Sequence, residues 1–143
     1  MSIVLDGTNG INVTNLGVGT TNSATTGEIR ATNEITAYYS SDINLKENIV
    51  EIENALEKLS HIRGVMFDWK DSYISQRGGE DDYFVRKHDT GIIAQEVEQV
   101  LPEIVVIRED GTKAVKYEKL LGLVIQGVNE LSKEVLALKE KVK

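Results

Sequence analysis

The chain has 143 residues, of which 41% are hydrophobic, no cysteine, and a formal net charge of −7 at pH 7. This length fits one ordinary domain with an appendage, and the apolar content argues against wholesale disorder. The negative charge disfavours nucleic acid as a partner, and the lack of cysteine excludes disulfides and thiol chemistry. No apolar run approaches the roughly 20 residues that span a bilayer, and no signal-peptide pattern opens the chain. We therefore expect a soluble protein that does not insert into a membrane.

Residues 1–40 are rich in Gly, Thr and Asn and contain no lysine. Short apolar or alternating pieces separated by Gly and Asn predict brief β-strands at 3–5, 11–13, 16–18 and 28–30. Strands this short need partners, because an isolated hairpin is only marginally stable in water. Several copies of the chain wound together would supply those partners. The alternative is an unstructured leader.

Residues 41–143 are charged and alternate between helical and strand patterns, which predicts an α+β fold. Apolar residues at spacings of three and four predict amphipathic helices at 48–59 and 92–101, the second stopped by Pro102. Strands are predicted at 65–69 and 104–107, and the Asp110-Gly111 turn pairs the latter with Ala114-Val115. The polar stretch 71–89 reads as an exposed insertion or hairpin tip.

The last segment, 115–143, is predicted to be a long helix. Its apolar residues alternate in spacings of three and four, the a/d seam of a coiled coil. This seam consists of Leu121, Val124, Val128, Leu131, Val135, Leu138 and Val142. The pattern predicts self-association, although a helix packing on its own domain could show a similar stripe. β-branched residues at a with Leu at d favour a dimer by themselves.

Ser41 and Lys46 lie five residues apart at the seam between the two halves of the chain. A serine hydroxyl beside an amine at such a boundary suggests that the chain cuts itself there. The alternative is structural: Ser41 or Asp42 caps the following helix and Lys46 is a solvated surface residue.

Four blocks in this order resemble a known family: 41–49, the strand 65–69, the stretch from 91–97 to 101–105, and 115–121 leading into the C-terminal helix. Together they resemble the self-cleaving intramolecular chaperone domain at the C-terminus of phage tailspikes, endosialidases, neck appendages and tail fibres. The resemblance covers residues 41–143, so the expected domains are a β-rich fibre end, 1–40, and a chaperone, 41–143.

The resemblance implies a homotrimer in the virion tail, made in the host cytoplasm, whose chaperone domains help three fibre chains to fold. It implies that Ser41 and Lys46 form a serine–lysine dyad and that the chaperone is released by a cut between Ser40 and Ser41. Family members usually carry hundreds of fibre residues before this point, so the chain is either truncated or a natural stub. In a stub, the domain would remain as a non-cleaving trimeric tip that contacts other tail proteins or a host receptor.

The chemistry predicted for this site is a single-turnover peptidase reaction. A serine needs a base to take its proton, and lysine serves as that base only when neutral, which burial or a nearby positive charge favours. Ser41 Oγ would attack the carbonyl of Ser40, and if packing of three subunits buries Lys46, cutting becomes conditional on assembly. Asp42 and Asn44 would support the turn. Gln95 and Glu96 would bond to neighbouring backbone or subunits, with a catalytic role as the poorer alternative.

No cofactor is expected, and an external substrate is not supported by any pocket motif. His61 and His88 have no cysteine beside them, so a metal would need the acids at 80–82, which read better as a solvated loop. Phe67, Trp69 and Tyr117 are predicted to be core or interface aromatics, with a carbohydrate platform as the poorer alternative.

Overall fold

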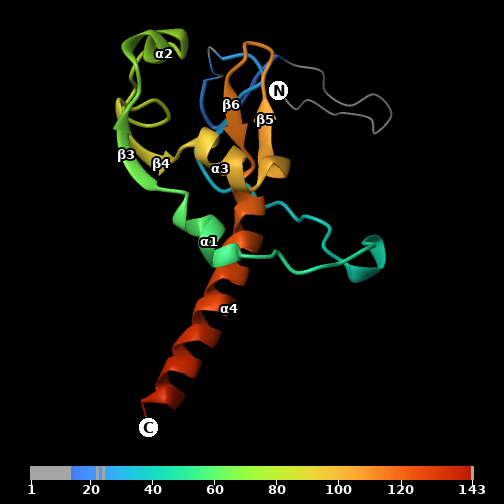
Figure 1. Ribbon diagram of the computed structural model, residues 1–143. Coiled ribbons are helices and arrows are strands. Elements are labelled where there is room, and N and C mark those ends of the chain that lie inside the picture. The colour runs from blue at the N-terminus through green and yellow to red at the C-terminus, as the bar shows by residue number, and fades with distance from the viewer. Residues whose placement is uncertain (1–13, 22, 24, 143) are drawn as a thin grey trace. The chain divides into compact units, whose positions relative to one another are not determined.

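The computed structural model describes residues 14–21, 23 and 25–142, and Figure 1 shows its helices and strands in chain order. The strands predicted at 3–5 and 11–13 lie outside these residues. The chain forms two compact units. The first contains the residues up to Ser40 together with Phe67–Asp89, and the second contains Ser41–Met66 together with Thr90–Lys143. The division into a fibre end and a chaperone at Ser41 stays a prediction.

In the first unit, β1 (Leu16–Val18) pairs in parallel with β2 (Ile29–Ala31). The strand at 16–18 is confirmed, and the second strand starts one residue later than predicted. Glu28 belongs instead to the turn, where its N–H donates to the Thr25 carbonyl at 3.3 Å. Gly19 has a φ of +70°, and a Cβ there would lie 2.4 Å from Thr32 Oγ1, so only glycine fits at the end of β1.

The segment 71–89 is predicted to be an exposed insertion or hairpin tip. It connects the paired strands Gly64–Asp68 and His88–Ile92, and nearly all of its residues are exposed or half-buried. Two features were not predicted: the helix α2 (Asp71–Gln76), and Val85, which is buried almost completely. The Tyr73 ring packs against Trp69 with centroids 4.6 Å apart, which holds α2 to the end of the preceding strand. Gly78 and Gly79 both have a φ of +94° and end the helix.

The strand β3 (Gly64–Asp68) is confirmed and pairs with β4 (His88–Ile92). The helix predicted at 92–101 therefore starts too early, because Ile92 still belongs to a strand. The helix α3 runs over Ala94–Val100, and the short 3-10 helix η2 (Pro102–Ile104) follows it. Within the second unit, Thr90 Oγ1 donates to the Val65 carbonyl at 3.1 Å and ties β4 to β3.

The helix predicted at 48–59 is also too long. The helix α1 covers only Ala55–Ser60, because Asn48 and Asn54 both have a φ of +53°. A left-handed residue interrupts a right-handed helix, so the apolar spacing before Ala55 does not continue into helical structure. The hairpin is confirmed: β5 (Val105–Ile107) pairs antiparallel with β6 (Lys113–Val115), and Gly111 in its turn has a φ of +80°.

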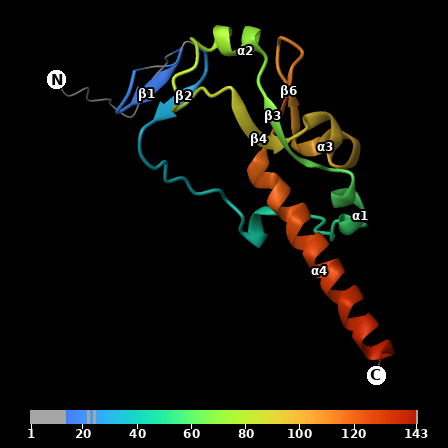
Figure 2. The same cartoon turned by 90° about the vertical axis from the view of Figure 1, so that its left-hand side faces the viewer.

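The helix α4 (Tyr117–Lys141) is the longest element, and Figure 2 shows it running past α1 to the C-terminus. It starts two residues after β6, later than the predicted residue 115. Leu123 of α4, Val97 of α3, Ala55 of α1 and Ile104 of η2 form the buried core of this unit. The prediction of an α+β fold is confirmed. Among the residues described, no helix is long and apolar enough to cross a membrane.

Candidate functional site

Ser41 and Lys46 flank a tight turn built on the 3-10 helix η1 (Ile43–Leu45). Leu45 N–H donates to the Asp42 carbonyl, and Lys46 N–H donates to the Ile43 carbonyl, both at 3.1 Å. These bonds fold the backbone back on itself within five residues. As a result, Lys46 Nζ lies 2.9 Å from Ser41 Oγ and 3.1 Å from the Ser41 carbonyl oxygen.

Asp42 and Asn44 hold this turn in place. The Asp42 carboxylate caps η1 by accepting hydrogen bonds from Asn44 N–H at 2.9 Å and from Asn44 Nδ2 at 2.8 Å. An Asp at the N-cap satisfies backbone donors that the helix itself leaves without partners. Asp42 therefore positions the Ser41 and Lys46 side chains and does not itself bond to either in these contacts.

The turn lies at the surface of the single chain. All of residues 41–50 are exposed, including the apolar side chains Ile43, Leu45, Ile49 and Val50. Burial favours the neutral form of a lysine, which is the form that accepts a proton. The single chain thus brings a nucleophile and an amine into contact but does not cover them.

Glu96 and Gln95 lie on α3, and Glu96 is part of an ion pair. Its carboxylate accepts hydrogen bonds from Arg63 N–H at 2.9 Å and Arg63 Nε at 2.7 Å. The hydrogen bonds and charge of Arg63 lower the pKa of Glu96, and the same contact raises the pKa of Arg63. Glu96 therefore ties α3 to the segment before β3, while Gln95 is exposed. No pattern in the sequence predicts that Glu96 pairs with Arg63, because the two residues are 33 positions apart.

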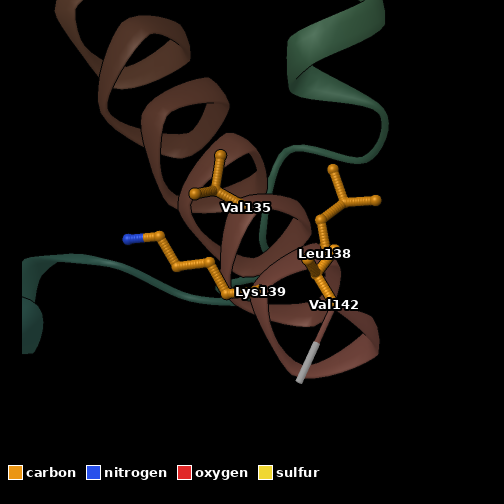
Figure 3. A pocket seen from close by; sticks show the side chains of 4 residues that line it. All are labelled: Val135, Leu138, Lys139 and Val142. Carbon is orange, nitrogen blue, oxygen red and sulfur yellow. The ribbon is translucent and has the colours of Figure 1, made fainter.

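All of the seam residues, from Leu121 on α4 to Val142 just after its end, are exposed in the single chain. The face of α4 that packs on α1 is a different one, centred on the buried Leu123 and Gly127. Towards the end of the helix, Val135, Leu138 and Val142 line an apolar hollow beside Lys139, as Figure 3 shows. The helix thus carries one face occupied by its own chain and one apolar face that is open.

The histidines and the acidic loop have local structural partners. His61 Nδ1 lies 2.9 Å from the Glu57 carbonyl, and His88 Nδ1 lies 2.7 Å from Asp68 Oδ1. The Asp81 carboxylate accepts hydrogen bonds from backbone N–H groups of its own loop, which lower its pKa. No cluster of three or more potential metal ligands occurs among the described residues.

Phe67, Trp69 and Tyr73 form a small aromatic cluster. The rings of Phe67 and Trp69 meet edge to face with centroids 4.9 Å apart, and Trp69 Nε1 donates to Asp89 at 3.0 Å. Both rings are half-buried, whereas Tyr117 at the start of α4 is exposed. Phe67 and Trp69 are therefore packing residues of the first unit.

These features define an α+β chain with a serine–lysine turn at Ser41 and a long helix whose apolar seam is exposed. Residues 41–106 match a known family model, described as the chaperone of endosialidase, and over these residues the chain belongs to that family. The match begins at Ser41, the residue that opens the turn.

The chain is also similar to long tail fibre proteins of phages. It is 38% identical over 108 residues to the long tail fiber protein Gp37 of Salmonella phage S16. It is 39% identical over 109 residues to the Gp37 proteins of Enterobacteria phages K3 and T2. Each match covers 73% of this chain but only 14% of the S16 protein and 8% of the other two. The chain therefore spans a small part of the length of these relatives.

Proposed function

We propose that this chain carries the intramolecular chaperone of a phage tail fibre, located in the virion tail. The domain joins three copies of the chain through α4 and then releases itself by a cut between Ser40 and Ser41. The family match over residues 41–106 and the likeness to Gp37 tail fibre proteins support this function. The observation that carries the cleavage step is the 2.9 Å contact between Lys46 Nζ and Ser41 Oγ at the first residue of the family match.

The trimer rests on the two faces of α4. Gly127 packs on α1 and Leu123 is buried, whereas the a/d seam is exposed and available to other copies of the same helix. Exposed apolar side chains at heptad spacing are stabilised when they are buried in a coiled coil. The number three comes from the family, because the residue types in the seam would by themselves favour two helices.

The cleavage chemistry uses only the chain's own atoms and water. Ser41 Oγ bonds to the carbonyl carbon of Ser40 while Lys46 takes the hydroxyl proton. The bond from that carbon to the Ser41 nitrogen breaks, and the proton passes to the leaving amine. The peptide has become an ester, which water hydrolyses to a Ser40 carboxylate and a free Ser41 hydroxyl.

Assembly would supply what the single chain lacks. Ile43, Leu45, Ile49 and Val50 surround the dyad with exposed apolar surface. Packing of neighbouring subunits over this segment would exclude water from Lys46 and favour the base form. The cut would then follow assembly and would not precede it.

The test is mass spectrometry of the purified chain, combined with size measurement by sedimentation. We expect a fragment that starts at Ser41, and we expect only intact chains from Ser41→Ala and Lys46→Ala. Ser60→Ala and Lys58→Ala are the matched controls, because both residues lie on α1 and away from the turn. Cleavage that persists at the same bond in Ser41→Ala and Lys46→Ala would reject the dyad.

A second function is favoured by the exposure of the turn. The exposed Lys46 amine donates to the Ser41 carbonyl as well as to the hydroxyl, a contact in which it acts as a donor. If Lys46 stays a donor and the chain is not cut, the domain would be a permanent trimeric tip of a fibre and could contact the host. Intact wild-type chains in a stable trimer would support this function over self-cleavage.

A further inference from the structure

The compact unit that contains the residues before Ser41 also contains residues from after it. Residues up to Ser40 group with Phe67–Asp89, which belong to the chaperone side of the chain. A cut between Ser40 and Ser41 would divide the polypeptide without dividing this unit. The noncovalent contacts within it would then join the two products.

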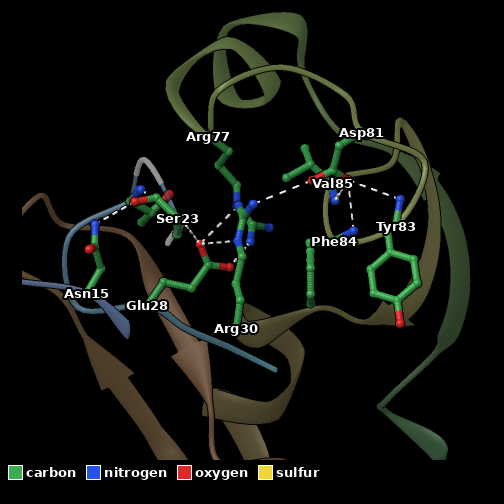
Figure 4. A network of polar contacts seen from close by, with 10 residues as sticks. Asn15, Ser23, Glu28, Arg30, Arg77, Asp81, Tyr83, Phe84 and Val85 are labelled. Carbon is green, nitrogen blue, oxygen red and sulfur yellow. Dashed lines mark hydrogen bonds and ion pairs between the residues drawn. The ribbon is translucent and has the colours of Figure 1, made fainter. Parts of the chain in front are cut away.

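Arg30 of β2 is the centre of these contacts. It is only 8% exposed, although arginine is rarely buried unless its charge has partners. Its guanidinium lies between Glu28 at 3.2 Å and Asp81 at 3.4 Å, and its Cζ lies 5.2 Å from the centre of the Phe84 ring. Figure 4 shows the Arg30 side chain with Glu28 on one side and with Phe84 and Asp81 of the loop on the other.

Glu28 adds a second ion pair across the same contact, to Arg77 at the end of α2. Burial alone would raise the pKa of Glu28, but the Ser23 hydroxyl and the charges of Arg77 and Arg30 outweigh it and lower the pKa. The charges therefore alternate as Arg77, Glu28, Arg30 and Asp81 across the contact. Tyr83 extends it, because its hydroxyl donates to the Thr32 carbonyl at 3.4 Å.

The loop presents these groups in a fixed arrangement. Asp81 Oδ1 accepts hydrogen bonds from the N–H groups of Tyr83, Phe84 and Val85 at 2.7 to 3.0 Å. The Asp81 N–H in turn donates to the Val85 carbonyl at 3.0 Å, and Val85 is buried. A loop held by its own bonds loses little conformational freedom when it binds, which favours tight association.

We propose that residues 77–85 form a binding surface for residues 28–32 of the same chain, and that this surface retains the chaperone on the fibre end after the peptide bond is cut. The partner is thus the segment on the other side of the cleavage site, recognised by alternating charges and by Phe84. Release of the chaperone requires a second step in which these ion pairs separate.

The experiment makes the same cut without self-cleavage. A recognition sequence for a site-specific protease is placed after Ala37, in the exposed segment 32–40, and Ser41→Ala removes the proposed nucleophile. After proteolysis of the full chain, gel filtration measures whether the N-terminal fragment stays with the C-terminal fragment, which contains residues 38–143. We expect the fragments to co-elute at low salt and to separate at about 1 M NaCl, where ion pairs are strongly screened.

The variants Arg30→Met and Arg77→Met keep an apolar stem but remove the charges. Each should make the fragments dissociate at least about tenfold faster, because the lost charge leaves its partner without compensation. Arg86→Met is the matched control in the same segment: Arg86 Nε donates to the Asp82 carbonyl, and the substitution should change nothing. Circular dichroism before proteolysis checks that each variant is folded.

Two results would overturn the inference. One is immediate loss of the N-terminal fragment from the otherwise wild-type chain at low salt. The other is equal retention in Arg30→Met, Arg77→Met and Arg86→Met. The inference relies on the proposed function only for the position of the cut. Whether the chain cuts itself is measured on the wild-type protein, without the inserted protease site. A negative result there would leave the present test, which uses the Ser41→Ala chain, unaffected.

Discussion

Gly127 of α4 lies so close to Leu59 of α1 that a Cβ at residue 127 would come within 2.3 Å of Leu59 Cδ1. Gly122, one and a half turns earlier on the same helix, has no heavy atom within 4 Å of its own Cβ position. Two glycines of one helix therefore differ in whether a side chain fits. The contact fixes how closely α1 approaches α4.

Leucine at position 127 should separate α1 from α4. We expect Gly127→Leu to lower the free energy of unfolding by about 1–3 kcal/mol, the usual cost of overpacking. Gly122→Leu should instead be neutral or stabilising by up to about 1 kcal/mol, because glycine is a poor helix former. Urea unfolding at a fixed chain concentration measures both. Equal effects of the two substitutions would show that the α1–α4 approach is not close.

Glu130 should make the stability of the second unit depend on pH. The Leu56 and Ala55 N–H groups donate to its carboxylate at 2.8 and 3.1 Å, and these bonds lower its pKa below the ordinary 4.5. Because the folded state favours the ionised form, this contribution is present above pH 4.5 and is lost as pH falls through the lower folded pKa. Thermal unfolding between pH 7 and pH 3 measures it. Glu130→Gln should unfold at a lower temperature at pH 7 than Glu134→Gln, and its unfolding temperature should fall less on acidification. Glu134→Gln is the control, because it changes an exposed residue one turn further along α4.

Charge in the seam should dissociate the proposed trimer. Leu131→Asp places a carboxylate among apolar seam positions, and we expect trimers to become monomers at micromolar concentration. Loss of a buried leucine alone costs about 2–5 kcal/mol per site, and an unpaired charge adds to this. Asn129→Asp is the control, because residue 129 is exposed and outside the seam. Sedimentation velocity distinguishes the species, and a trimer that survives Leu131→Asp would place the interface elsewhere.

Arginine at position 46 separates charge from basicity. Lys46→Arg keeps a donor near Ser41, but arginine stays protonated in proteins and cannot act as the base. We expect the rate of cutting to fall by at least about 100-fold, the low end of what a general base contributes. The fraction of chains cut over time, measured by mass spectrometry, gives this rate. An unchanged rate would mean that Lys46 acts only by holding Ser41.

Asp42 should matter for geometry and not for chemistry. Asp42→Ala removes the cap of η1, which typically costs about 1 kcal/mol, and should slow cutting by loosening the turn. Asp42→Asn keeps an oxygen that accepts the Asn44 N–H and should restore most of the rate. If Asn at 42 is as slow as Ala, the charge of Asp42 acts directly on the reaction.

The parts of the structure that sequence could predict are those whose cause is local. Ser41 and Lys46 meet because a turn needs only five residues, and the β5–β6 hairpin follows from Asp110-Gly111. The long helix was predictable because its apolar period repeats over many turns. The start of the helix predicted at 48–59 was wrong for another reason. Asn54 takes a left-handed conformation that apolar spacing does not reveal, so α1 starts only at Ala55.

The contacts between distant residues could not be predicted from one sequence. Arg30 and Asp81 are 51 residues apart, and Arg63 and Glu96 are 33 apart. Such pairs depend on how loops fold back, which no local pattern records. The helix α2 was missed for a different reason: its six residues are too few to show a helical period, although the Trp69–Tyr73 ring contact that holds it is local.

Beyond Glu130, the side chains of α4 to Val142 are exposed on every side in the single chain. A stretch of this length is only marginally helical in water without something to pack against. A lone newly made chain should therefore have a fraying end, and its last turns should become ordered only on meeting its neighbours. In the proposed trimer, this end of the helix would then become ordered only when all three chains are present.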